Sequence, residues 1–118
     1  MEYLILLYHW IADFICQTDN MAKNKSKSNK ALGKHILAYT TVLFLGSLTI
    51  LPFSKAVLLS LFNGIIHFGV DYVTSRITSR LYQKGRTHDF FVIIGLDQLV
   101  HTVILLESYK VILNLSGI

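Results

Sequence analysis

The chain has 118 residues, enough for one domain, and 53% of them are hydrophobic while only 15% are charged. A soluble domain typically has about 25% charged residues, so this composition argues against a water-soluble protein and favours a chain surrounded mainly by lipid. The net charge is +4, but aromatic residues are not interleaved with the basic ones in the way that stacks nucleic acid bases. No nucleic acid partner is therefore expected, and the single cysteine excludes a disulfide within the chain.

Four apolar segments, separated by short polar connections, predict four helices. The first, residues 1–17, is short for a membrane span of about 20 residues and leads into a lysine-rich connection. The second, residues 30–51, stops before Pro52, which cannot continue a helix. The third covers residues 54–84 and the fourth covers residues 88–114.

The basic residues concentrate in and around the first and third connections. They form two groups: Lys23, Lys25, Lys27, Lys30 and Lys34, and then Arg76, Arg80, Lys84 and Arg86. In a chain whose helices run up and down, these two connections lie on the same side of a membrane, and cytoplasmic loops are enriched in lysine and arginine. We therefore expect an all-α, up-down four-helix transmembrane bundle, with the basic loops cytoplasmic. Residues 1–118 then form one integral membrane domain in contact with lipid, and so thin a bundle is compatible with a homo-oligomer.

Three of the four segments carry a histidine and an aspartate four residues apart, which places both side chains on one face of a helix. These pairs are His9/Asp13, His67/Asp71 and Asp97/His101, and the remaining segment holds His35. Ionisable groups inside a bilayer are costly unless they turn inward and meet one another. We therefore expect these side chains to converge between the middle of the membrane and its cytoplasmic surface.

Imidazoles and carboxylates without thiolates suit a divalent metal, zinc first and manganese or iron as alternatives. All seven side chains are candidate ligands: His9, Asp13, His35, His67, Asp71, Asp97 and His101. Four further polar side chains are expected to support them by hydrogen bonds: Gln17, Tyr39, Asn63 and Gln98. A bound metal would activate water for hydrolysis of a phosphoester or another anionic substrate, with Asp13 or Asp97 accepting the proton.

Two other functions fit the same pattern, and the residues alone leave them open. The histidines and aspartates could form a buried hydrogen-bond network that fixes the register of the helices, at about 1 kcal/mol for each contact. The protein would then be non-enzymatic. A chain of such side chains inside a membrane could also relay protons or ions.

Several motifs taken together are familiar. They are His9-Trp10-Ile11-Ala12-Asp13-Phe14-Ile15-Cys16-Gln17, Asn24-Lys25, His35-x-x-x-Tyr39, Asn63-Gly64-Ile65-Ile66-His67-x-x-x-Asp71, Ser75-Arg76 and Gly95-Leu96-Asp97-Gln98-x-x-His101. Over nearly its whole length the chain resembles a family of small bacteriophage and bacterial membrane proteins of unknown function. The resemblance implies a phage or prophage origin and an integral protein of the bacterial (host) inner membrane. The non-enzymatic alternative is then a phage protein that alters the host envelope or blocks a host partner. A looser resemblance, in spacing only, is to membrane-bound metal-dependent hydrolases and helical zinc phospholipases, although the chain lacks the Glu pair and the length of the phospholipases.

Overall fold

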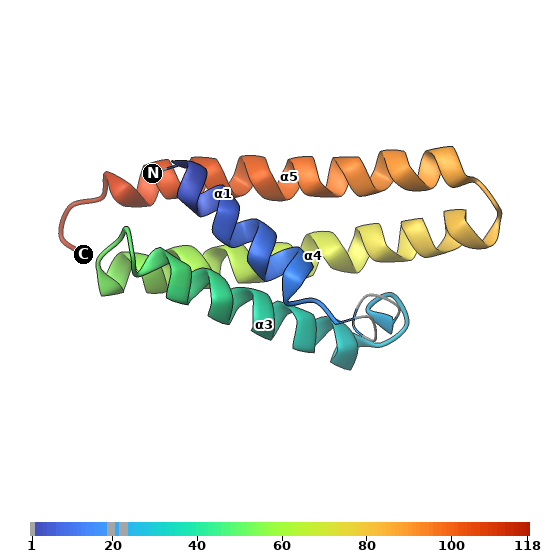
Figure 1. Cartoon of the computed structure of the whole chain (residues 1–118), viewed down its shortest axis with the longest axis horizontal. Coiled ribbons are helices and arrows are strands. Elements are labelled where there is room, and N and C mark those ends of the chain that lie inside the picture. The colour runs from blue at the N-terminus through green and yellow to red at the C-terminus, as the bar shows by residue number, and fades with distance from the viewer. Residues whose placement is uncertain (1, 19–20, 22–23) are drawn as a thin grey trace.

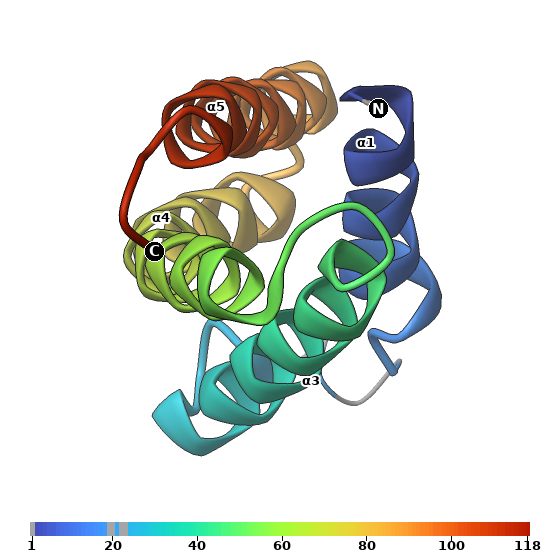
Figure 2. The ribbon, with the colours of Figure 1, turned by 90° about the vertical axis from the view of Figure 1, so that its left-hand side faces the viewer.

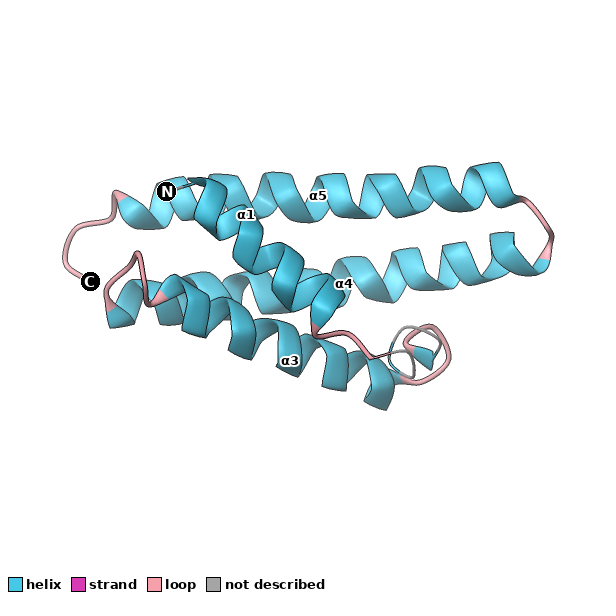
Figure 3. Ribbon diagram, in the orientation of Figure 1, coloured by secondary structure: helices cyan, strands magenta, loops and turns pink. Residues whose placement is uncertain are grey.

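A computed structural model describes residues 2–18, 21 and 24–118 of the chain. These residues form helices and connections, with no strand among them (Figure 3). Helix α1 (Glu2–Trp10) continues directly into one π-helical turn, η1 (Ile11–Ile15), and is followed by α3 (Asn29–Ser47), α4 (Phe53–Gln83) and α5 (Thr87–Leu113). The expected all-α class with four helices is confirmed for this part of the chain. Met1 and Lys23, which the sequence placed in the first helix and the first basic connection, lie outside the described residues.

The helix ends follow local sequence signals. Ser28 caps α3, because its hydroxyl accepts a hydrogen bond from the backbone N–H of Ala31 at 3.3 Å. The same helix ends at Ser47, earlier than the expected residue 51, since the chain closes tighter i→i+3 turns ahead of Pro52. Gly85 has a φ of 70° in the turn between α4 and α5, a left-handed conformation that favours glycine.

The four helices run up and down around a common core. In the end-on view, α1 and α4 lie on opposite sides, and α3 and α5 lie between them (Figure 2). Helices α4 and α5 form a long hairpin, and α1 crosses it obliquely (Figure 1). Both termini lie at one end of the bundle, while the α4–α5 turn and the connection before α3 lie toward the other (Figure 1). The two basic connections therefore share one end of the molecule.

Close helix contact depends on a small residue where α1 meets α3. A Cβ atom placed on Gly46 would lie 2.5 Å from the ring of Tyr8, closer than carbon atoms can approach without a shift of one side chain. The hydroxyl of Tyr8 also lies 2.6 Å from that of Thr49, just after α3. Most of the apolar core gathers on this side of the bundle, toward the termini, and includes Ile5, Leu43, Leu51, Ala56, Leu59, Leu105, Tyr109 and Ile112.

The outer surface is strongly apolar. Large side chains are exposed along both long helices, including Phe53 at 69%, Ile65 at 73% and Leu99 at 59%. Helices α4 and α5 are each long and apolar enough to cross a membrane. The interior, in contrast, buries ionisable side chains, which soluble proteins seldom do. The described residues thus combine an apolar exterior with a polar centre.

Candidate metal centre

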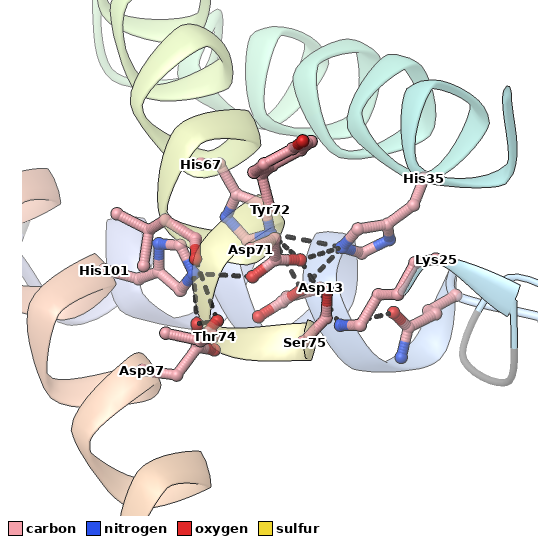
Figure 4. Close-up of polar contacts among 12 residues, drawn as sticks. Asp13, Lys25, His35, His67, Asp71, Tyr72, Thr74, Ser75, Asp97 and His101 are labelled. Atoms are coloured by element: carbon pink, nitrogen blue, oxygen red, sulfur yellow. Dashed lines mark hydrogen bonds and ion pairs between the residues drawn. The ribbon is translucent and has the colours of Figure 1, made fainter. Parts of the chain in front are cut away.

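The polar centre is a cluster of seven side chains, which we call the His/Asp cluster; all of them except His9 are labelled in Figure 4. Its members come from every helix: His9 and Asp13 from α1 and η1, His35 from α3, His67 and Asp71 from α4, and Asp97 and His101 from α5. None of them is more than 8% exposed. The structure therefore brings all the side chains that the sequence proposed as metal ligands into one buried region.

The π-helical turn sets the direction of Asp13. The backbone N–H of Cys16 donates to the carbonyl of Ile11 at 3.0 Å, an i→i+5 bond where an α-helix would use i→i+4. This wider turn rotates each residue by less than the 100° that α-helical spacing assumes. Asp13 consequently lies 3.9 Å from the Nε2 atom of His9 but only 3.1 Å from that of His35. Turns of this kind are frequent at functional sites.

Four ligand atoms form the most compact part of the cluster, the first ligand group. They are Asp13 Oδ1, His35 Nε2, His67 Nε2 and Asp71 Oδ2. The Asp13 oxygen lies 3.1 Å from the His35 nitrogen and 3.3 Å from the His67 nitrogen. The two nitrogens are 3.1 Å apart, and the Asp71 oxygen is 3.3 Å from each of them. Donors from η1, α3 and α4 thus face a common point.

These separations suit the ligand shell of a small divalent ion. Ligand atoms about 2.0–2.1 Å from a tetrahedral zinc are about 3.3 Å from one another, and neighbouring ligands of an octahedral first-row ion are about 3.0 Å apart. The separations that involve the two nitrogens span 3.1–3.3 Å, and all four atoms lie within 4.8 Å of one another. Hydrogen bonds satisfy these four atoms only in part. If the Nε2 atoms of His35 and His67 both donated protons to the carboxylates, the two protons would also face each other, because the nitrogens are 3.1 Å apart.

A second ligand group lies beside the first and consists of Asp71, Asp97 and His101. The Nε2 atom of His101 is 3.0 Å from Asp71 Oδ1 and 3.3 Å from Asp97 Oδ1. The hydroxyl of Thr74 lies 2.6 Å from the same Asp97 oxygen. Asp71 therefore belongs to both groups and lies between His35 and His101 (Figure 4).

Gln98 and Tyr39 hold the outer atoms of the cluster. The Nε2 atom of Gln98 donates to Asp13 Oδ2 at 3.0 Å and to Asp97 Oδ2 at 3.2 Å, so one amide links a carboxylate of each ligand group. His9 contacts the Tyr39 hydroxyl through Nδ1 at 2.9 Å and the Gln98 oxygen through Nε2 at 3.3 Å. Both nitrogens of His9 thus have neutral hydrogen-bond partners. His9 lies beside the two ligand groups and belongs to neither.

Ring stacking fixes the orientation of His67. Its ring centroid lies 4.1 Å from that of Tyr39 and 3.9 Å from that of His101. The Nδ1 atoms of His35 and His67 have no hydrogen-bond partner among the described residues. Both rings therefore make their polar contacts through Nε2, the atoms that face the carboxylates.

Lys25 and Thr74 contact the cluster although the sequence did not mark them as site residues. The ammonium group of Lys25 lies 3.3 Å from Asp71 Oδ2 and 3.3 Å from the Gln17 side-chain oxygen. Among the described lysines and arginines, it is the one in ion-pair contact with a cluster aspartate. Lys25 belongs to the Asn24-Lys25 pair of the motifs that carry the family resemblance, but its spacing does not relate it to the histidine and aspartate pairs. Thr74 could have been found, because it follows Asp71 by three residues on the same helix face.

Asn63 lies apart from the cluster, although it was expected to support it. Its amide donates to the Ser108 hydroxyl at 2.9 Å and to the Leu59 carbonyl at 3.0 Å. It links α4 to α5 further toward the termini. Of the other expected supporting residues, Tyr39 and Gln98 contact the cluster directly, and Gln17 reaches it through Lys25.

The fold and the cluster define a class: an all-helical protein with two helices apolar enough to cross a membrane and a buried His/Asp group that could hold a metal ion. The chain belongs to the family described as "Protein of unknown function (DUF3307)", which matches residues 2–117. No curated protein and no solved structure matches the chain. The family match confirms the expected relationship to a family of unknown function. A phage origin and a relationship to membrane-bound metal-dependent hydrolases stay predictions.

Proposed function

We propose that the protein is an integral membrane metalloenzyme that hydrolyses a phosphoester, or another anionic ester, at the cytoplasmic face of the membrane. The observation that carries this proposal is the first ligand group, in which four donor atoms from three elements lie 3.1–3.3 Å from their neighbours. Two imidazoles and two carboxylates favour zinc, manganese or iron. We take zinc as the first choice.

The charge of the cluster supports a bound cation. Asp13, Asp71 and Asp97 are all buried, and buried carboxylates are costly unless they are paired or coordinate a metal. Lys25 supplies one positive charge to this region. A divalent ion would supply the two that remain, with the imidazoles neutral.

The position of the cluster supports action at a membrane surface. From Phe53 to Asp71, α4 rises by about 27 Å at 1.5 Å per residue, which is close to the hydrocarbon thickness of about 30 Å. If α4 enters the bilayer near Phe53, the cluster lies near the opposite interface, toward the end with the basic connections. That end is cytoplasmic by the enrichment of basic residues in cytoplasmic loops. Among the described helices, α4 and α5 are the two that are long and apolar enough to span a membrane. Exposed side chains on α1 and α3, such as Tyr3 and Leu37, would also contact lipid in this arrangement.

The residues of the cluster suit hydrolysis with metal-activated water. A bound divalent ion would make a coordinated water more acidic and would polarise a phosphoryl oxygen. Hydrolysis would join the water oxygen to phosphorus and break the bond from phosphorus to the alcohol oxygen. A cluster carboxylate, Asp13 or Asp97, would accept one water proton and pass it to the leaving alcohol oxygen. The basic connections would attract the anionic substrate.

Metal content and hydrolysis by the purified chain in lipid nanodiscs test the proposal. We expect at least one divalent ion per chain, its loss in His67→Ala, and its retention in His88→Ala, which replaces an exposed histidine outside the cluster. Hydrolysis of p-nitrophenyl phosphate or bis(p-nitrophenyl) phosphate should stop with EDTA and return with Zn²⁺ or Mn²⁺. A wild-type chain that binds no metal after incubation with these ions would contradict metal binding. Metal binding without hydrolysis of either ester would contradict the enzymatic part.

One contact favours a second candidate, in which the cluster holds the helices together without catalysis. The ammonium group of Lys25 lies 3.3 Å from Asp71 and neutralises a buried carboxylate without any metal. In that case alanine substitutions in the cluster would lower the unfolding temperature, and added Zn²⁺ would not raise it. An ion that binds only the folded state raises the unfolding temperature by mass action. The change in unfolding temperature on addition of Zn²⁺ therefore separates the two candidate functions.

A further inference from the structure

We infer that the His/Asp cluster binds a second divalent ion in the second ligand group, with Asp71 as the carboxylate that bridges the two ions. This inference rests on the proposed function, because it takes the first ligand group to hold an ion. It also narrows the substrate to a phosphate monoester.

A bridging role for Asp71 is indicated because its two oxygens face different ligand groups. Oδ2 lies 3.3 Å from the Nε2 atoms of both His35 and His67, whereas Oδ1 lies 3.0 Å from that of His101. The residue is only 1% exposed, so both oxygens take their partners from inside the protein: Oδ1 from the cluster, and Oδ2 from the cluster and from Lys25. Carboxylates that face two donor sets in this way are suited to hold two ions about 3.5–4 Å apart.

The second group has the donors of an open metal site. The Nε2 atom of His101 lies 3.0 Å from Asp71 Oδ1 and 3.3 Å from Asp97 Oδ1, close to the 3.1–3.3 Å of the first group. Three protein ligands are typical of catalytic sites, which keep a further position for water or substrate. The rings of His67 and His101, one from each group, stack 3.9 Å apart with 15° between their planes.

Support from the surrounding residues is shared between the two groups. Gln98 holds the outer oxygens of Asp13 and Asp97 with one amide nitrogen, while the Oδ1 atom of each faces the histidines. Hydrogen bonds to the outer atom of a ligand orient its inner atom toward the metal. Gln98 therefore orients one carboxylate of each group.

The net charge of the cluster differs between one and two bound ions. With one divalent ion, the three buried carboxylates are neutralised by that ion and Lys25. A second ion gives the cluster two net positive charges. A phosphate monoester carries close to two negative charges at neutral pH, so the two-ion cluster would attract this substrate class by charge where the one-ion cluster would not.

Manganese stoichiometry tests the second ion. The purified chain in nanodiscs is loaded with Mn²⁺, freed of excess ion and assayed by elemental analysis, with circular dichroism to check the fold. We expect two ions per chain in the wild type and one in His101→Ala or in Asp97→Asn, which conserves the volume of the side chain. The matched controls His88→Ala and Asp89→Asn, outside the cluster, should keep two.

Electron paramagnetic resonance gives a measurement on the wild type that needs no variant. Two Mn²⁺ ions bridged by a carboxylate couple magnetically, so the signal should be broadened relative to that of isolated Mn²⁺. His101→Ala should restore the resolved pattern of isolated ions. Phosphate monoester hydrolysis should fall at least tenfold in the same variant.

The outcomes distinguish this inference from the proposal beneath it. One ion per chain in the wild type, lost in His35→Ala and unchanged in His101→Ala, would overturn the second ion and leave the first in place. Two ions retained in both His101→Ala and Asp97→Asn would also overturn it. A wild-type chain without any ion would overturn the proposed function itself.

Discussion

Replacing Gln98 with leucine would remove the side chain that joins the two ligand groups while nearly conserving its volume. Its amide nitrogen donates to Asp13 at 3.0 Å and to Asp97 at 3.2 Å, and its oxygen lies 3.3 Å from His9. Leucine can make none of these contacts. Both carboxylates would lose a donor and with it part of their fixed orientation.

The size of the effect follows from these contacts. A hydrogen bond to a charged group contributes about 1.5–3 kcal/mol, so two of them set an upper limit of about 3–6 kcal/mol on the destabilisation of the metal-free chain. The effect on metal binding is smaller, because the ion itself attracts the carboxylates. Loss of a supporting residue typically weakens metal binding about 10–100-fold, which corresponds to about 1.4–2.7 kcal/mol.

The assay is the dissociation constant for Zn²⁺, measured by competition with a chromophoric chelator on the chain in nanodiscs. Thermal unfolding of the metal-free chain is recorded in parallel. Gln83→Leu is the matched control, because Gln83 is exposed at the end of α4 and should change neither quantity. If Gln98→Leu folds and binds Zn²⁺ within twofold of the wild type, Gln98 does not orient metal ligands and the assignment of its role is wrong.

Three further predictions concern other parts of the structure. Lys25→Met should tighten Zn²⁺ binding several-fold in the chelator assay, because the ammonium no longer competes with the ion for Asp71. The same substitution should destabilise the metal-free chain by about 1–3 kcal/mol. Unchanged affinity would show that Lys25 does not compete with Zn²⁺. Gly46→Ala should lower stability by about 1–3 kcal/mol, since its Cβ would overlap the Tyr8 ring, whereas Gly69→Ala, with nothing within 4 Å, should be neutral or stabilise by up to about 1 kcal/mol. Equal effects of the two in thermal unfolding would contradict the close contact. Bound Zn²⁺ should fall as the pH is lowered from about 8 to about 5.5, because protons compete with the ion for the imidazoles; constant metal content over this range would refute histidine ligation.

Much of the fold was predictable because α4 and α5 are regular. Their hydropathy marks them as long apolar helices, and α-helical spacing places His67 beside Asp71 and Asp97 beside His101. An ionisable pair on an apolar helix must find compensation inside the bundle. Sequence and structure therefore agree that the helix faces carrying His67/Asp71 and Asp97/His101 meet inside the bundle.

The parts of the site that escaped prediction depend on irregular or distant contacts. Asp13 turns toward His35 because of a π-helical turn, which no residue pattern in this segment announces. Lys25 reaches Asp71 from a connection, across 46 positions of sequence. Polar residues also continue along the His67 face of α4 beyond the cluster. Asn63 lies on this face, one turn before His67, but its amide donates to Ser108 and not to a cluster residue.

The apolar exterior and the polar centre depend on each other physically. Few water molecules can reach side chains that are at most 8% exposed, so attraction between the carboxylates and a cation is stronger there than at a wet surface. The same burial makes the carboxylates repel one another when no cation is present. Because the ligands come from η1, α3, α4 and α5, this repulsion would push all the helices apart. Metal binding and helix association should therefore be coupled, and metal removal should loosen the whole bundle.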